Sequence, residues 1–352
     1  MINIEQVFSS SDHYRQAFEK GLVDIIHHQT AGTFILGCAN TFQHAELLEK
    51  NIGLLQSTYD NIARQYQLCK EQNIEPDDSA DDAAVINRLI EIGFENLNPV
   101  QSKTISLGSI SFTVNYNQLR SFRPSRMSGA KKLDINTAFN EDGFHFDKEF
   151  LIKETFAEGS FHGRQLSLLY NKFPFVDYHA LLVLDKHLHH NQCLTENHLD
   201  FIAMFMAQIQ TQIPELVIAY NSLGAGASVN HLHFQLYLEK APLSIFSSEI
   251  NLNGGTKPYP IPCIIFNEQK DCWSHIKELH SSNAPYNLIF KGNKIYCFHR
   301  QATVIEFNNI DVSMYGWAEM AGIFTVTDKK LFDVIDSHLL LNTLKSVTTK
   351  HS

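Results

Sequence analysis

The segment His231–Leu238 combines residues that can perform phosphoryl chemistry with a spacing that places them together. Alternate side chains of a β-strand point to the same face, so one face would present His231, His233, Gln235 and Tyr237. The other face would carry only apolar side chains, those of Leu232, Phe234, Leu236 and Leu238. The pattern predicts a strand that packs on a core with one face and presents two imidazoles and an amide to a substrate with the other.

A glycine-containing loop, LGAGASVN, comes immediately before this strand. Gly224 and Gly226 let the backbone approach a ligand closely, because glycine adopts φ angles that are closed to other residues. Ser228 and Asn230 add polar side chains, and the backbone N–H groups of such a loop can surround an anion. A phosphate that binds to this loop would lie beside a row of histidines, and this arrangement favours phosphoryl transfer.

His233 is the candidate nucleophile. An attacking imidazole needs one unprotonated nitrogen, and its other nitrogen is best held by a carbonyl or carboxylate that fixes the tautomer. A histidine with an ordinary pKa near 6.5 is mostly neutral at pH 7. Two alternatives stay open for His231 and His233: a metal site with a third ligand such as His179, or a purely structural pair.

A second H-x-H pattern, His187 and His189, has no glycine loop before it. We interpret these two residues and His190 as polar residues of a loop.

The composition narrows the class of protein. The net charge of −10 argues against a long nucleic acid as partner, since binding to a phosphate backbone favours a basic surface. The six cysteines lack the spacing of a zinc ribbon or a redox pair, so we expect reduced, structural thiols. The N-terminus does not resemble a signal peptide, and no apolar stretch has the length to cross a bilayer. We therefore expect a cytoplasmic protein that does not bind membranes.

The elements around these residues can also be predicted. Residues 43–72 form one long helix with a heptad-like apolar seam, which we interpret as a core-packing stripe, with a homodimer contact as the alternative. A second helix follows four acidic residues and ends near Gly93, and a third begins after Thr195. Strands are predicted at 104–116, 166–172, 179–185, 214–221, 231–238, 287–291 and 294–298, and a last helix at 328–345.

The stretch 120–132 is basic and includes Arg123 and Arg126. It is either a solvated arm on the surface or a flap over a phosphate-rich substrate, because the forked guanidinium group suits phosphate oxygens.

The stretch NSLGAGASVNHLHFQ resembles the signature of the GDP-hexose phosphorylases. That family is grouped with the galactose-1-phosphate uridylyltransferases and the diadenosine tetraphosphate phosphorylases, which share an H-x-H-x-Q motif within the histidine-triad superfamily. YNKFPFVDYHALLVLDKH (170–187) is similar to the first-half pattern of the superfamily, and this similarity places Asn171 and His179 in the active site. Weaker similarities extend the resemblance over residues 112–326, whereas the first hundred residues resemble no family.

The resemblance implies an α+β, histidine-triad-like fold of two halves, each an antiparallel sheet packed with helices. The implied units are an N-terminal helical extension (1–100), a catalytic half (101–245) and a degenerate C-terminal half (246–352). The implied activity is that of a nucleotidyltransferase: His233 takes the nucleotide from an NDP-sugar such as a GDP-hexose, and inorganic phosphate then releases it as NDP. A dinucleoside polyphosphate phosphorylase, a hexose-1-phosphate uridylyltransferase and a nucleotide-binding protein without turnover are the alternatives.

The resemblance assigns catalytic roles to His233, His231 and Gln235. The residues expected to contact nucleotide or phosphate are Asn171, His179, Asn221, Gly224, Gly226, Ser228, Asn230, Arg123 and Arg126. We expect no metal and no cofactor, and the expected partners are a small-molecule nucleotide sugar and phosphate.

Overall fold

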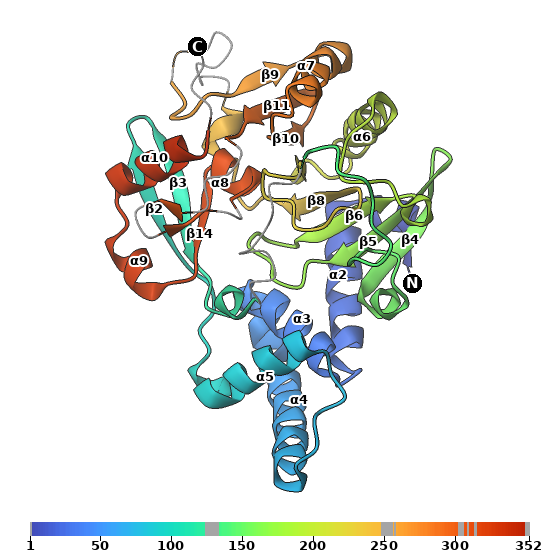
Figure 1. The fold of residues 1–352 in the computed structure, drawn as a ribbon, viewed down its shortest axis with the longest axis vertical. Helices are drawn as coiled ribbons and strands as arrows, with labels where there is room; N and C mark the ends of the chain where they lie inside the picture. Colours follow the sequence, from blue (N-terminus) through green and yellow to red (C-terminus); the bar gives the residue numbers. More distant parts are fainter. Residues whose placement is uncertain are drawn as a thin grey trace.

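The computed structural model describes residues 2–123, 134–247, 256, 258–301, 306–307, 310–312 and 315–348. Its centre is a nine-stranded sheet with the order β1-β4-β5-β6-β8-β7-β10-β11-β9, in which only β1 and β4 pair in parallel (Figure 1). The first strands are β1 (Ile2–Asn3), β4 (Thr155–Phe161), β5 (Arg164–Tyr170), β6 (Ala180–Leu184) and β7 (Leu216–Asn221). The others are β8 (His233–Leu238), β9 (Ile264–Phe266), β10 (Tyr286–Lys291) and β11 (Lys294–His299).

Strands from both expected halves belong to this one sheet. β7 pairs with β10, so the sheet continues across the expected boundary at residue 245. The α+β class with a mainly antiparallel sheet is confirmed. The division into three units at residues 100 and 245 remains an interpretation of the sequence.

Helices from the N-terminal region share a core with one face of this sheet. This core contains side chains from α1 to α7 and from the sheet, for example Phe18, Leu36, Leu199, Phe234 and Ile276. The helices are α1 (Ile4–Val7), α2 (Ser11–Ile26), α3 (Ala31–Phe42), α4 (Ala45–Gln72), α5 (Ala80–Ile92), α6 (Glu196–Ile209) and α7 (Gln269–Ser281). The region from Ile2 to Leu97 is therefore packed onto the sheet, and the tip of α4 extends away from it (Figure 1).

A second core lies on the other face of the sheet and contains Tyr237, Trp317 and Phe324. It includes a three-stranded sheet, β14-β3-β2, made of β2 (Gln101–Leu107), β3 (Ile110–Tyr116) and β14 (Ile323–Val326). The remaining helices and strands are α8 (Trp317–Ala321), α9 (Lys329–Val334), α10 (Ser337–Ser346), β12 (Glu306–Phe307) and β13 (Ile310–Asp311). Short 3₁₀ helices occupy Phe94–Asn96, Leu119–Phe122, Glu149–Glu154, Lys186–Leu188 and Ser244–Phe246.

Local sequence signals account for most helix ends. Thr195 caps α6 in a capping box with His198, as the polar side chain before an apolar helix predicts. The predicted helix over 43–72 is confirmed as α4, which ends at Asn73 in the left-handed region. The single helix predicted over 328–345 is wrong: it is divided into α9 and α10, because the Asp336 side chain accepts a hydrogen bond from Leu339 N and starts a new helix.

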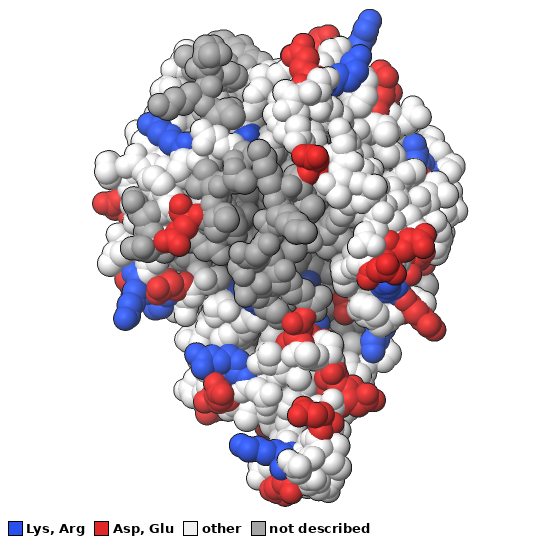
Figure 2. Space-filling view, viewed as in Figure 1, with Lys and Arg blue, Asp and Glu red and all other residues white. Residues whose placement is uncertain are grey.

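The surface in Figure 2 carries interspersed acidic and basic side chains, without an extended basic patch among the described residues on that face. No helix in the described part of the chain is both long and apolar enough to span a membrane.

Candidate active site

Strand β8 has the two faces that the sequence predicts. Phe234 and Leu236 lie in the core that α1–α7 form with the sheet, and Tyr237 lies in the core on the opposite face. The strand begins at His233 rather than at His231, so His231 belongs to the loop that enters the strand. His233 and Gln235 are only 5% and 9% exposed, which places both polar side chains in an environment with little water.

The main chain fixes the tautomer of His233. Its Nδ1 lies 2.8 Å from the carbonyl oxygen of His231. A carbonyl can only accept a hydrogen bond, so Nδ1 carries the proton and Nε2 keeps a lone pair. Burial lowers the pKa of His233 to about 4. The result is an imidazole that is neutral at pH 7, with its unprotonated nitrogen directed away from the main chain.

A buried glutamine, Gln192, holds the backbone at His233. Its Nε2 donates to the carbonyl oxygens of Asn221 (2.8 Å) and His233 (3.1 Å), and its Oε1 accepts from His233 N (2.9 Å). The last β7–β8 pair is Ala219 with Gln235. The Gln192 amide thus supplies hydrogen bonds at the end of the ladder, where the two strands separate into the glycine loop.

His231 has the opposite tautomer. Its Nδ1 accepts a hydrogen bond from Phe146 N at 3.0 Å, so the proton lies on Nε2 when the ring is neutral. Burial is the main cause that lowers its pKa to about 3, and the neighbouring His233, His145 and His189 add to the shift. The buried Nε2 has no hydrogen-bond partner in the described part of the chain.

Aromatic and histidine rings surround His231. The ring centroids of Phe139, His145 and His189 lie 5.3, 6.0 and 5.9 Å from its own. His189 stacks on Phe139 at 4.7 Å, and its Nε2 lies 3.2 Å from a carboxylate oxygen of Asp147. His189 is thus a polar residue of a loop, as the sequence predicts, and this loop folds back over the residues that enter β8. The exposed side chain of His187 instead pairs with Asp147 at the surface.

The Gln235 side chain has one hydrogen-bond partner that precedes it in the sequence and one that follows it. Its Oε1 accepts from Nε1 of Trp317, at 2.7 Å, and its other partner is the side chain of His179. His179 is fully buried, and burial lowers its pKa to about 3. Asn171 packs its amide 3.3 Å from His179 Nε2 and accepts from Phe173 N. The structure thus brings Asn171 and His179 behind Gln235, and Trp317 adds a group from the C-terminal region.

Arg120, the first residue of the basic stretch, lies close to this group. Its guanidinium sits 4.7 Å from the centre of the Phe175 ring, which in turn contacts His179 at 4.5 Å. Burial and the neighbouring charge of Arg123 lower the pKa of Arg120 to about 10. Burial also lowers the pKa of Arg123. Arg126 lies outside the described residues.

The glycine loop packs against the segment before α8. Gly226 has a φ of +96°, and a Cβ there would lie 2.8 Å from Gly316 Cα and 2.9 Å from Tyr315 O. Gly224 also has a positive φ, +77°. Gly226 therefore allows a close approach of the loop to the protein's own backbone, whereas a Cβ at Gly224 would meet the ring of Pro285 at 3.0 Å.

Two polar side chains of the loop, those of Asn221 and Asn230, form hydrogen bonds with other parts of the protein. Asn221 accepts through Oδ1 from Trp317 N (2.9 Å) and from the amide of Asn287 (2.7 Å). Asn230 accepts from Gln192 N (2.9 Å) and donates to the main chain at Ala138 (2.8 Å). Both side chains hold the loop in place, whereas Ser228 is half-buried in the same loop.

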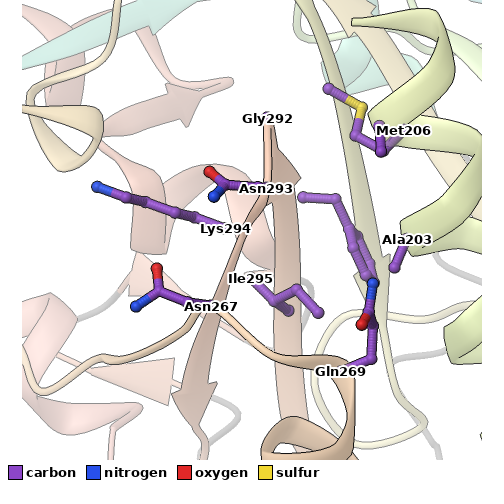
Figure 3. Close-up of a pocket in the computed structure, with 10 residues that line it drawn as sticks. Ala203, Met206, Asn267, Gln269, Gly292, Asn293, Lys294 and Ile295 are labelled. Carbon is purple, nitrogen blue, oxygen red and sulfur yellow. The ribbon is translucent and has the colours of Figure 1, made fainter.

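Two further features lie elsewhere. Among the described residues, His275, Cys297 and His299 form a group of three whose ligand atoms are close enough to share a metal ion, and His231 and His233 belong to no such group of three. A pocket with about 370 Å³ of empty space, partly open solvent, lies between α6 and the β10–β11 turn and is lined by Met206, Lys294 and others (Figure 3). Met206 and Phe290, which line it, belong to the core on the helix-covered face of the sheet. The His233 side chain belongs to the opposite face, so the pocket is a separate feature.

The fold and site together define an α+β protein with a neutral histidine at the start of a central strand. Residues 95–237 match the family model "GDPGP1-like, N-terminal domain", which confirms the resemblance to the GDP-hexose phosphorylases over this segment. The crystal structure of yeast Ap4A phosphorylase Apa2 in complex with Ap4A is similar at a TM-score of 0.49 and 14% identity, covering 77% of this chain and 98% of that chain. The crystal structure of yeast Ap4A phosphorylase Apa2 in complex with AMP is similar at a TM-score of 0.49 and 15% identity, covering 78% of this chain and 99% of that chain. No match is found among curated proteins.

Proposed function

We propose that this protein is a nucleotidyltransferase that cleaves an NDP-sugar, of the GDP-hexose type, with inorganic phosphate through a nucleotidyl-His233 intermediate. The observation that carries the proposal is the 2.8 Å hydrogen bond from His233 Nδ1 to the His231 carbonyl. It leaves Nε2 unprotonated in a buried imidazole, which is the form a histidine nucleophile requires.

In the first step, Nε2 of His233 forms a bond to the α-phosphorus. The bond from that phosphorus to the bridging oxygen breaks, and hexose 1-phosphate leaves with the bonding electrons. The imidazole ring gains positive charge in this step. Because Nδ1–H points at the His231 carbonyl, that charge forms against a fixed dipole, which stabilises the intermediate.

His231 suits the role of a hydrogen-bond donor to a phosphate oxygen. Its Nε2–H is buried and lacks a partner among the described residues, and its tautomer is fixed by Phe146 N. An unpaired buried N–H costs free energy, so a hydrogen bond from this group to a negatively charged phosphate oxygen would be strongly favourable. Gln235, held by Trp317 and His179, is the second side chain of the row that could contact the nucleotide.

In the second step, an oxygen of inorganic phosphate attacks the same phosphorus, and the bond to Nε2 breaks. The product is NDP, and His233 returns to its neutral form. We assign the binding of the two anionic substrates to the glycine loop with Ser228 and to Arg123 and Arg126, and the lining of the nucleotide site to Asn171 and His179. The match of residues 95–237 to the GDPGP1-like family model supports a GDP-hexose as the nucleotide-sugar substrate.

The test uses GDP-glucose and GDP-galactose labelled with ³²P at the α-phosphate. We expect the wild-type protein to gain acid-labile, base-stable label, and phosphate to discharge it as labelled GDP. His233→Ala should gain none, whereas His338→Ala, which removes an exposed histidine of α10, should label like the wild type. Equal labelling of His233→Ala would refute the proposal.

The alternatives give different outcomes with the same protein. Label from diadenosine tetraphosphate but not from GDP-hexoses would assign a dinucleoside polyphosphate phosphorylase. Discharge by hexose 1-phosphate instead of phosphate would assign a uridylyltransferase-type exchange. Nucleotide binding without label or product would assign a binding protein, and each of these results would overturn the GDP-hexose assignment.

A further inference from the structure

Three residues with nitrogen or sulfur ligand atoms converge on the helix-covered side of β11. Cys297 and His299 are two positions apart on this strand, so their side chains share a face. Cys297 belongs to the core that α7 also contributes to, and His275 comes from the middle of α7. One ligand atom of each residue lies within 4.8 Å of the other two.

The two imidazoles face each other through their Nε2 atoms. These atoms lie 2.5 Å apart, which is closer than the ~2.9 Å of an ordinary N–H hydrogen bond. The rings are nearly parallel, with an interplanar angle of 17° and a centroid distance of 4.7 Å. The two Nε2 atoms therefore point at each other, and the sulfur of the buried Cys297 lies within 4.8 Å of both ligand nitrogens.

This ligand set suits a zinc ion. Zn–N distances of about 2.0–2.1 Å and Zn–S distances of about 2.3 Å separate the ligand atoms of one tetrahedral ion by roughly 3.3–3.8 Å. The observed separations run from 2.5 Å to no more than 4.8 Å, so zinc binding requires the two imidazoles to move apart by about 1 Å and to turn toward a shared point. Glu278 lies one turn along α7 with a carboxylate oxygen 3.8 Å from Nδ1 of His275, the outer nitrogen that a zinc-bound histidine commonly pairs with a carboxylate.

We propose that His275 Nε2, His299 Nε2 and the Cys297 thiolate bind one zinc ion that joins α7 to β11. On binding, the S–H bond of Cys297 breaks, its proton leaves to solvent, and a Zn–S bond forms. A water molecule takes the fourth position. Because β9 pairs with β11 at the end of the nine-stranded sheet, the ion fixes the helix to this edge of the sheet. The site is independent of the nucleotidyl transfer proposed above.

A competing explanation is a pair of imidazoles that share one proton. It would give the same approach of the two Nε2 atoms without any need for Cys297. The thiol therefore distinguishes the two explanations, because a shared proton is indifferent to it whereas a zinc ion requires the thiolate.

The experiment measures metal content and Co²⁺ spectra of the untagged full-length chain. We expect the wild type, dialysed against Zn²⁺ and then freed of excess metal, to retain one zinc per chain. Loading with Co²⁺ after removal of zinc by a chelator should give the visible bands of a tetrahedral site and a near-ultraviolet thiolate-to-cobalt band. Cys297→Ser should lose the thiolate band. His275→Ala and His299→Ala should bind zinc at least tenfold more weakly and should no longer retain one zinc per chain.

Matched controls separate site from surface effects. Cys69→Ser on α4 and His338→Ala on α10 should retain one zinc and both cobalt bands. If a variant fails to fold, the chelator and reloading series on the wild type alone still decides. A wild type that binds no zinc at tenfold molar excess, or a thiolate band that survives in Cys297→Ser, would overturn the proposal.

Discussion

Gln192 offers a direct test of how the backbone positions the candidate nucleophile. Its buried amide makes three hydrogen bonds to main-chain groups of Asn221 and His233. Gln192→Ala leaves these three groups buried and unpaired, at about 1–3 kcal/mol each, less what local relaxation recovers. We expect the free energy of unfolding to fall by about 3–5 kcal/mol.

A second substitution separates hydrogen bonding from packing. Gln192→Glu keeps the volume and one acceptor oxygen, but it replaces the donor that faces two carbonyl oxygens. We therefore expect Gln192→Glu to cost as much as Gln192→Ala, although it leaves no cavity. Gln67→Ala, at an exposed position of α4, should change stability by less than about 0.5 kcal/mol.

The assay is urea unfolding followed by circular dichroism, together with the rate of α-phosphate labelling at saturating GDP-hexose. If the hydrogen bonds of the Gln192 amide position His233, the variants that still fold should label at least tenfold more slowly. Stability within 1 kcal/mol of the wild type for both Gln192 variants, or unchanged labelling rates, would refute the reasoning.

Three other predictions concern the same region. Burial lowers the pKa to about 3, 3 and 4 in His179, His231 and His233. The unfolded chain, with pKa values near 6.5, binds more protons below that pH, so the free energy of unfolding should fall as the pH drops from about 6.5 toward 4, and these three histidines should contribute up to about 4 kcal/mol per pH unit to that fall. Urea titrations at pH 7.5, 6 and 5 check this, and pH-independent stability would contradict it. Trp317→Phe removes the 2.7 Å hydrogen bond to Gln235 with little loss of ring volume, so labelling should slow by about tenfold, equivalent to ~1.4 kcal/mol, with a smaller loss of stability; a labelling rate equal to wild type would show that the orientation of Gln235 is unimportant. Gly226→Ala should cost about 2 kcal/mol more than Gly108→Ala in thermal or urea unfolding, since both have positive φ angles but only Gly226 meets backbone atoms below 3.0 Å; equal costs would exclude the close contact.

The alternation of β8 could be predicted because it is a local property. A strand with one face in a core requires an apolar residue at every second position, and residues 232–238 meet this requirement without reference to the rest of the chain. The cap of α6 at Thr195 is local for the same reason. Of the two groups that suit the second nitrogen of a nucleophilic histidine, a carbonyl or a carboxylate, the loop that enters the strand supplies a carbonyl to His233.

The groups that position the site could not be predicted, because long-range packing creates them. Gln192 acts on residues 29 and 41 positions away, and Trp317 reaches Gln235 across 82 positions. Nothing in the type or spacing of these residues marks them. His187, His189 and His190 show the same limit: the H-x-H spacing alone does not tell which ring the loop brings back to His231. The cluster on β11 combines a helix and a strand, so it lacks the short spacing of a zinc motif.

His231 and His233 are chemically identical side chains, and both are buried and neutral at pH 7. What separates their roles is the main-chain group that each ring meets: an N–H at Phe146 for one, a carbonyl for the other. An N–H forces the ring to accept, so the outer nitrogen becomes a donor; a carbonyl forces it to donate, so the outer nitrogen keeps its lone pair. The pair therefore presents one donor and one lone pair, the two functions that transfer of a phosphoryl group to histidine requires. Since both functions depend on backbone groups, the proposed transfer would depend on the segment around Phe146 and the turn at His231 as strictly as on the imidazoles themselves.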